Sequence, residues 1–242
     1  METFTTDSIT LYNGDCNEVI KTIEDGEVSL LCTDPPYTIN NLDPGNASRW
    51  KSFRNSMKEL NGIDKGYGIE SLSVDIQRVM GGGINAYFWC NKQQILDYLK
   101  TYVDCLGCKY DILIWHKTNT VPTFSNKYLT DKEYCLYFRK GKGKLHPKNY
   151  EMARTVFTSP MNVETKKNYN HPSIKPLNII QTLVENTSDE GDLVFDPFTG
   201  SGTTAIACLR SNRRFVGCEI DKTYFDIAVR RIKDELSQPQ LF

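Results

Sequence analysis

The stretch that decides the fold is Leu193-Val-Phe-Asp-Pro-Phe-Thr-Gly-Ser-Gly-Thr-Thr-Ala205. It opens on an apolar run typical of a buried strand, passes through a glycine turn, and predicts a helix from about Thr203. Gly200 and Gly202 let the backbone approach a ligand closely, and the helix start offers free N–H groups. Glu219 ends the next apolar run, where an acid commonly binds ribose hydroxyls in βαβ units. So complete a unit favours a nucleotide-binding turn over a purely structural one.

This stretch alone leaves the type of nucleotide open. Residues 200–205 fit the dinucleotide pattern G-x-G-x-x-G/A, so an NAD-dependent enzyme is a competing interpretation. A phosphate-binding P-loop is excluded, because no Lys-Ser or Lys-Thr pair follows the glycines. The 38 residues after Thr204 are enough for only one strand and two helices. Earlier parts of the chain must therefore complete the sheet.

Apolar runs typical of strands recur along the chain, at Ile9–Tyr12, Val28–Thr33, Ile84–Trp89, Asp111–Trp115, Glu133–Phe138, Leu193–Phe195 and Phe215–Cys218. Most are continuously apolar rather than alternating, which indicates strands covered on both faces. Helical periodicity marks Leu177–Val184 and the residues after Asp221, which can cap a helix. We therefore predict an α/β, Rossmann-like domain over residues 1–242, with a mostly parallel seven-stranded sheet and helices on both faces.

A second motif, Thr33-Asp-Pro-Pro-Tyr37, ends the apolar run that begins at Val28. The exocyclic amine of adenine or cytosine is a poor nucleophile, because its lone pair is delocalised into the ring. An enzyme can localise that pair by accepting hydrogen bonds from both N–H groups. Asp34 offers a carboxylate acceptor and Pro35 a backbone carbonyl, while Pro35 and Pro36 restrict φ and hold the two acceptors in register. Tyr37 offers a flat face on which an extruded base can stack.

The two motifs together predict methylation of a base amine. The tetrapeptide alone would also fit a rigid turn, but hydride transfer has no use for it, so the NAD interpretation is disfavoured. A sulfonium methyl placed in line is an adequate electrophile for an amine activated in this way. The residues thus predict S-adenosylmethionine as the nucleotide cofactor.

With both motifs in place, the chain resembles the amino-group DNA methyltransferases of the β arrangement. Members of this family carry (D/N/S)-P-P-(Y/F/W) before an F-x-G-x-G cofactor turn, which here are Asp34–Tyr37 and Phe198–Gly202. The resemblance implies adenine N6 as the target, because Asp opens the tetrapeptide where Ser is common in the cytosine-N4 enzymes. It runs through nearly the whole chain and includes Asn13–Cys16, Ile112–Lys117, Glu133–Phe138 and His171–Pro176.

The resemblance also implies a role for each site residue. Base handling falls to Asp34, Pro35, Pro36 and Tyr37. Cofactor contacts are implied for Asp15, Lys175, Asp196, Pro197, Phe198, Gly200, Ser201, Gly202, Thr203, Thr204 and Glu219. From the residues alone, Asp15 would be interpreted as a turn residue and Lys175 as a solvated charge. The implied mechanism uses neither a covalent enzyme intermediate nor a metal, and the family suggests a restriction–modification enzyme.

Three other activities are alternatives to adenine-N6 methylation of DNA. Cytosine N4 is the first, and RNA in place of DNA is the second. The third is a catalytically silent binding subunit, against which the intact Asp34 and both glycines argue. Glutamine methylases are disfavoured, because they usually begin the tetrapeptide with Asn and place the cofactor turn before it.

Composition limits the partners, the metal content and the cellular location that we expect for the protein. The net charge of −1 excludes a general polyanion binder, so DNA must meet a local patch. The eight cysteines are scattered, and only Cys105 and Cys108 have metal-like spacing, so we expect reduced thiols and no metal. No apolar run is long enough for a membrane span, and the first residues lack a signal-peptide core. These features predict a cytoplasmic protein, and the resemblance implies a bacterial or phage-encoded one.

Two long polar segments, residues 38–70 and 140–170, are predicted to be loops over the site. Both contain or adjoin basic residues, and the first interleaves them with Trp50 and Phe53, as expected for phosphate contact and base extrusion on double-stranded DNA. The run Arg139–Lys148 holds five positive residues and no acid, and is expected to flank the site. Because the recognition region at 140–170 is short for the family, we expect a homodimer or residues 38–70 to add contacts.

Overall fold

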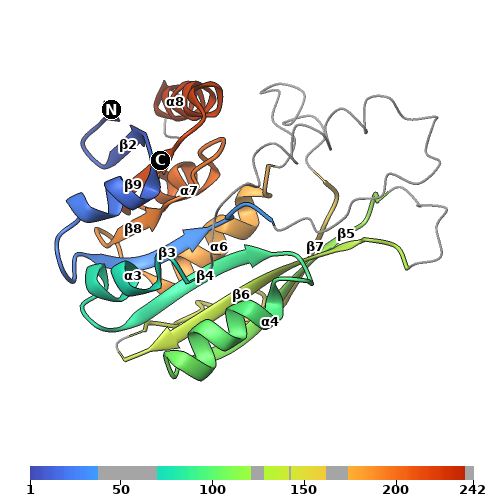
Figure 1. Ribbon diagram of the computed structural model, residues 1–242. Coiled ribbons are helices and arrows are strands. Elements are labelled where there is room, and N and C mark those ends of the chain that lie inside the picture. Colours follow the sequence, from blue (N-terminus) through green and yellow to red (C-terminus); the bar gives the residue numbers. More distant parts are fainter. Residues whose placement is uncertain (38–69, 121–127, 142, 162–173, 238–242) are drawn as a thin grey trace, which may run out of the picture.

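The computed structural model describes residues 1–37, 70–120, 128–141, 143–161 and 174–237. These residues form a nine-stranded sheet in the order β1-β2-β9-β8-β3-β4-β6-β5-β7 (Figure 1). The strands are β1 (Glu2–Thr5), β2 (Ile9–Asn13), β3 (Val28–Thr33), β4 (Ile84–Cys90), β5 (Lys109–Lys117), β6 (Lys132–Lys140), β7 (Val156–Ser159), β8 (Leu193–Asp196) and β9 (Arg214–Glu219).

The pairing of these strands is mostly parallel. From β2 through β9, β8 and β3 to β4 every neighbour is parallel, and β7 is parallel to β5. Only β1 against β2, and β6 against β4 and β5, are antiparallel. The predicted mostly parallel α/β sheet is confirmed.

All seven predicted strands are present, but the predicted number of strands is wrong, because two edge strands, β1 and β7, were missed. Both lie at the margins of the sheet, and most of their residues are exposed or half-buried. An edge strand does not need the continuous apolar run that marks a central one. For this reason the segment 140–170, which contains β7, was predicted to be a loop throughout.

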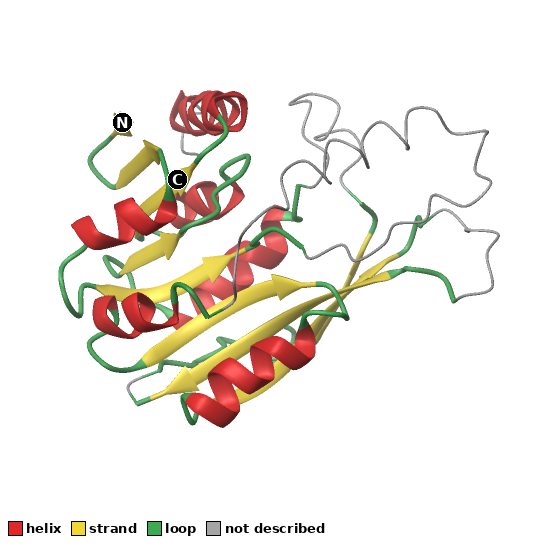
Figure 2. Ribbon diagram, viewed as in Figure 1, coloured by secondary structure: helices red, strands yellow, loops and turns green. Residues whose placement is uncertain are grey.

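Helices cover both faces of the sheet, as predicted (Figure 2). One face carries α6 (Leu177–Thr187), α7 (Thr203–Arg210) and α8 (Lys222–Ser237), and the other carries α1 (Cys16–Val19), α3 (Ser73–Val79) and α4 (Ile95–Leu99) with the short turns η1 (Ile20–Thr22) and η2 (Lys100–Cys105). Every residue of β4 is buried as a result, which explains why all of its residues except Asn85 are apolar. No helix in the described part of the chain is long and apolar enough to cross a membrane.

The eight cysteines are free thiols, and six of them are buried. Of the pair with metal-like spacing, Cys105 is exposed and Cys108 is buried. Within the described ranges, no three His, Cys, Asp or Glu side chains gather closely enough to hold a metal ion.

Parallel pairing brings the C-terminal ends of β2, β9, β8, β3 and β4 to one edge of the sheet, which we call the carboxyl edge. Strand β5 also ends there, because it is antiparallel to β6, which is itself antiparallel to β4. The two sequence motifs follow β3 and β8, which are direct neighbours, with Leu31 opposite Phe195. The fold therefore brings the two motifs together, at the edge where open α/β sheets bind ligands.

Candidate active site

The Asp34–Tyr37 loop leaves the end of β3 and is held by two side-chain contacts. The Tyr37 hydroxyl donates a hydrogen bond to Asp34 Oδ1 at 2.8 Å. From beyond β4, Gln94 Nε2 donates to the Pro36 carbonyl at 3.2 Å, and Gln94 is itself held by Asn91, whose backbone N–H donates to Gln94 Oε1 at 3.2 Å. The orientation of the loop is thus fixed by contacts as well as by its two prolines.

Lys175 lies directly against this loop, with only 5% of its side chain exposed. Its ammonium group donates to Asp34 Oδ2, lies 3.1 Å from the Tyr37 hydroxyl oxygen, and lies 3.2 Å from Glu133 Oε2. The rings of Tyr37 and Trp89 are 5.4 Å and 5.3 Å from the same nitrogen, within cation–π range. A solvated charge is therefore the wrong interpretation of Lys175.

The ionic states of Lys175 and its neighbours are set by burial and by the opposite charges beside them. Burial disfavours the ammonium form, but the adjacent Asp34 and Glu133 carboxylates outweigh it and hold the Lys175 pKa above its ordinary value. Burial likewise opposes the Glu133 carboxylate, yet Lys175 and Lys117 outweigh it and lower the Glu133 pKa to about 2. Burial, assisted by Asp34 and Glu133, raises the Tyr37 pKa, so the phenol stays protonated and can donate.

The glycine turn follows β8 and is held by Glu219 at the end of β9. Glu219 Oε2 accepts the Gly200 N–H at 2.9 Å, and Oε1 accepts the Asp221 N–H at 2.8 Å. Burial raises the Glu219 pKa to about 7, although both amide hydrogen bonds oppose that shift. The backbone of Gly200 and Gly202 has positive φ angles of 53° and 83°, which L-amino acids rarely adopt.

Asp196 connects the glycine turn to the Asp34–Tyr37 loop. Thr33, the residue before Asp34, donates its hydroxyl to Asp196 Oδ1 at 2.6 Å, and the Phe198 N–H donates to the same oxygen at 3.1 Å. Burial raises the Asp196 pKa to about 6, against the opposing effect of these hydrogen bonds. One buried carboxyl group thus bonds to both motifs.

Four other predicted cofactor residues make structural contacts around the turn. Arg231 Nη1 of α8 donates to the Ser201 carbonyl at 2.6 Å, to the Ser201 hydroxyl at 2.8 Å and to Thr203 Oγ1 at 3.2 Å. The Thr204 hydroxyl donates to the Cys32 carbonyl at 3.4 Å, and the Pro197 carbonyl accepts the Cys218 thiol at 3.3 Å. These contacts anchor the turn on α8, β3 and β9.

Asp15 is placed at the same edge, beyond β9. It follows β2, where Asn13 pairs with Glu219 and donates its side-chain amide to the Glu219 carbonyl at 2.8 Å. Asp15 caps α1 by accepting the Asn17 N–H at 2.8 Å. Four neighbouring strands, β2, β9, β8 and β3, therefore each bring one carboxyl group to the carboxyl edge. In that order, the residues are Asp15, Glu219, Asp196 and Asp34.

The basic run 139–148 does not flank this site, so that prediction is wrong. Lys140 pairs with Ile84, the first residue of β4, which places the run at the opposite edge of the sheet. Three described cations of the run also contact acids: Arg139 contacts Asp111, Lys144 contacts Asp189 and Asp192, and Lys148 contacts Glu185. Residues 38–69 of the predicted loop lie outside the described residues, and so does His171.

Sequence reasoning missed four residues of the site: Thr33, Gln94, Lys117 and Glu133. Glu133 begins a predicted strand, and Lys117 lies two residues beyond the end of another. They lie at or beside the carboxyl edge and contact each other across the β5–β6 pair. A charged residue in an otherwise apolar strand was the available signal. Gln94 lies beyond the end of β4, without a recognisable motif.

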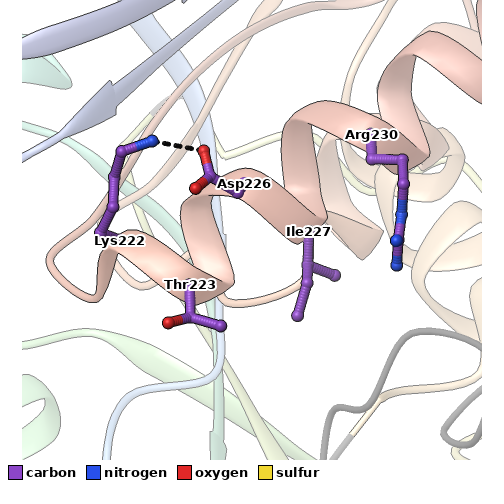
Figure 3. A pocket seen from close by; sticks show the side chains of 5 residues that line it. All are labelled: Lys222, Thr223, Asp226, Ile227 and Arg230. Atoms are coloured by element: carbon purple, nitrogen blue, oxygen red, sulfur yellow. Dashed lines mark hydrogen bonds and ion pairs between the residues drawn. The ribbon is translucent and has the colours of Figure 1, made fainter.

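A separate pocket lies on α8, outside the cluster just described (Figure 3). It is lined by Lys222, Thr223, Asp226, Ile227 and Arg230, and Lys222 pairs with Asp226 across its rim. None of the predicted site residues lines it.

Comparison with known proteins places these observations in a family. The family model for DNA methylases of the N6/N4 type matches residues 28–230. The chain is 23% identical to the Type II methyltransferase M2.MboI of Moraxella bovis, over 91% of this chain and 86% of that protein. It is 33% identical to the Type II methyltransferase M2.DpnII of Streptococcus pneumoniae, over 51% of this chain and 50% of that protein. The crystal structure of the M1.HpyAVI–SAM complex is similar with a TM-score of 0.68 and 25% identity, over 92% of this chain and 99% of that chain.

Proposed function

The chain belongs to the N6/N4 family of DNA methylases, and we propose that it methylates the exocyclic N6 of adenine in double-stranded DNA. It is a DNA methyltransferase, and S-adenosylmethionine is its methyl donor. Its similarity to Type II methyltransferases supports a place in a restriction–modification system. The adenine base, the double-stranded substrate and the roles of individual residues are the proposed part.

The observation that carries the proposal is the connection between the two motifs through Asp196. The Thr33 hydroxyl and the Phe198 N–H share Asp196 Oδ1, at 2.6 Å and 3.1 Å. Asp34 follows Thr33 directly, and the glycine turn follows Phe198. A carboxylate suited to an amine and a turn suited to a nucleotide are therefore held in one rigid arrangement, as a transfer between two bound molecules requires.

In this proposal, Asp34 and the Pro35 carbonyl accept hydrogen bonds from the two N–H groups of the target amine. The lone pair on nitrogen is then localised and available for reaction. As the amine gains positive charge, the Asp34 carboxylate stabilises it electrostatically. Tyr37, whose hydroxyl is already bonded to Asp34, offers its ring face to the extruded base.

The donor and acceptor groups around the glycine turn fit S-adenosylmethionine. Each Glu219 oxygen accepts one N–H and keeps lone-pair capacity for a ribose hydroxyl. The positive φ angles at Gly200 and Gly202 shape the turn between β8 and α7 at the carboxyl edge. We propose Asp15 and Phe198 as more peripheral members of this cofactor set. When bound there, the cofactor supplies the electrophilic methyl group.

DNA contact is proposed for residues at the carboxyl edge. Strand β7 is parallel to β5 and runs towards that edge, so its end at Ser159 lies at the edge that holds the site, unlike the run 139–148. Residues 38–70 are proposed to add phosphate contacts and base-extruding aromatic side chains. The homodimer, expected from the short recognition region, also stays a proposal.

The proposal is tested by incubating the protein with methyl-labelled S-adenosylmethionine and either unmodified genomic DNA or total RNA. Digested nucleosides are then identified by mass spectrometry, with Asp34→Ala as the control. We expect N6-methyldeoxyadenosine from the wild type alone. N4-methyldeoxycytidine would correct the base, and label in RNA alone would overturn the DNA substrate. No label in either, despite cofactor binding, would indicate a silent subunit.

A further inference from the structure

Four charged side chains form a chain of contacts along the carboxyl edge, in the order Lys117, Glu133, Lys175 and Asp34. They come from the end of β5, the start of β6, the residue two before α6, and the loop after β3. Lys117 and Glu133 have 12% and 16% of their side chains exposed, and Lys175 has 5%. Together the four carry two positive and two negative charges, so the cluster is neutral.

Such a cluster is weak as a source of stability. Removing charges from water costs several kcal/mol per ion, and their mutual attraction often only offsets that cost. Hydrophobic residues of similar size would commonly serve the fold as well. The order of the charges therefore requires another explanation, and it ends on the residue proposed to activate the base.

The contacts fix the orientation of the Asp34 carboxylate through both of its oxygens. Tyr37 donates to Oδ1 at 2.8 Å, and Lys175 donates to Oδ2. Rotation of the carboxylate would break at least one of these bonds. The ammonium of Lys175 is in turn held between Glu133 and the rings of Tyr37 and Trp89.

Glu133 solves an electrostatic difficulty that Lys175 creates. A lone ammonium beside Asp34 would cancel the negative charge that a developing positive amine needs. Glu133 offsets the ammonium from its other side, at 3.2 Å, so the charge of Asp34 remains effective towards the base. Lys117 then offsets Glu133, on its second carboxylate oxygen.

We propose that Lys175, held by Glu133, is a positioning residue for Asp34, and that its main role is to fix the base-activating carboxylate rather than to bind the cofactor. This inference rests on the proposed function, in which Asp34 receives the target amine. It differs from the cofactor contact that the family resemblance implies for Lys175.

The test measures two quantities on purified variants. The first is the dissociation constant of S-adenosylmethionine, by titration calorimetry. The second is the single-turnover rate of methyl transfer to unmodified genomic DNA, with both substrates saturating. The variants are Lys175→Met, the charge-neutral double variant Lys175→Met/Glu133→Gln, and Lys144→Met as the matched control. Lys144 also contacts two carboxylates, but at the opposite edge of the sheet.

For Lys175→Met we expect an unchanged dissociation constant, within about threefold, and a transfer rate lowered about 100-fold, the loss typical of a misplaced catalytic group. The double variant keeps the cluster neutral, with one positive charge on Lys117 and one negative charge on Asp34. It should therefore fold even if the single variant does not, and should show the same separation between binding and rate. Lys144→Met should behave as wild type in both measurements.

Two results would overturn the inference. One is cofactor binding at least tenfold weaker in the double variant, which would make Lys175 a cofactor contact. The other is wild-type transfer by the double variant. Failure of the proposed function itself would look different, because the wild type would then methylate no DNA at all.

Discussion

Replacing Gly202 by alanine should destabilise the protein measurably, because two independent costs arise at this position. The backbone has a φ of 83°, where an L-residue costs about 1 to 2 kcal/mol. A Cβ atom would also lie 3.1 Å from the Cβ of Ala228 and 3.3 Å from its Cα, which is closer than normal packing. Overpacking of this kind costs about 1 to 3 kcal/mol. We therefore expect the free energy of unfolding to fall by about 3 kcal/mol.

A double-mutant cycle separates the two costs. Ala228→Gly removes the methyl group that the new Cβ would meet, but leaves the φ strain in place. Alone, Ala228→Gly should cost about 1 kcal/mol, since glycine is unfavourable inside α8. The double variant should be more stable than the sum of the single effects by about 1 kcal/mol or more.

Urea unfolding followed by circular dichroism gives all four free energies at one pH. Equal stability of Gly202→Ala and wild type would refute the proposed strain and overlap. Strict additivity in the cycle would refute the close approach of the turn to α8, while leaving the φ cost intact.

Three further predictions follow from the contacts at the site. Gln94→Ala removes the donor to the Pro36 carbonyl, so the single-turnover rate of methyl transfer should fall about tenfold. The cofactor dissociation constant, measured by calorimetry, should stay constant. A rate and a cofactor affinity that fall by the same factor would contradict a local effect on the Asp34–Tyr37 loop. Because burial raises the Glu219 pKa from 4.5 to about 7, its contribution to stability is complete below pH 4.5 and is lost as the pH rises to 7. Wild type should therefore lose about 3 kcal/mol more than Glu219→Gln between pH 4.5 and pH 7.5 in urea titrations, and parallel pH profiles would refute the shift. Lys144→Ala/Lys148→Ala should leave the salt dependence of DNA binding unchanged, because both cations contact acids at the opposite edge of the sheet. A smaller slope of the logarithm of the DNA-binding constant against the logarithm of salt concentration, measured by filter binding, would show that the run 139–148 contacts DNA.

Strands that are buried on both faces were predictable from the sequence, and exposed edge strands were not. Strands such as β3, β4 and β8 are covered on both faces, so their sequences are mostly apolar and were identified correctly. The edge strands β1 and β7 face solvent, so their sequences carry no such run. The helix after Asp221 was also predicted correctly, and Asp221 caps it by accepting the N–H groups of Thr223 and Tyr224.

The site was predictable where contiguous residues form it, and not where the fold assembles it. Asp34–Tyr37 and the glycine turn are local motifs whose strands end side by side. Lys117 and Glu133 meet only because β5 and β6 pair. The run 139–148 contains no acid, yet folding brings acids from elsewhere in the chain against it. The order of charged residues along the chain does not show which of them the fold brings into contact.

The central claim is that the Asp34 carboxylate, held beside the cofactor turn, activates the target amine. Asp34→Asn keeps the shape of the side chain but replaces one acceptor oxygen by a donor and removes the charge. The decisive measurement is the single-turnover rate of methyl transfer by this variant, at saturating S-adenosylmethionine and DNA, beside its cofactor dissociation constant. We predict cofactor binding within about threefold of wild type and transfer slower by about 1,000-fold. Transfer at the wild-type rate would contradict the claim, whatever the affinity for the cofactor.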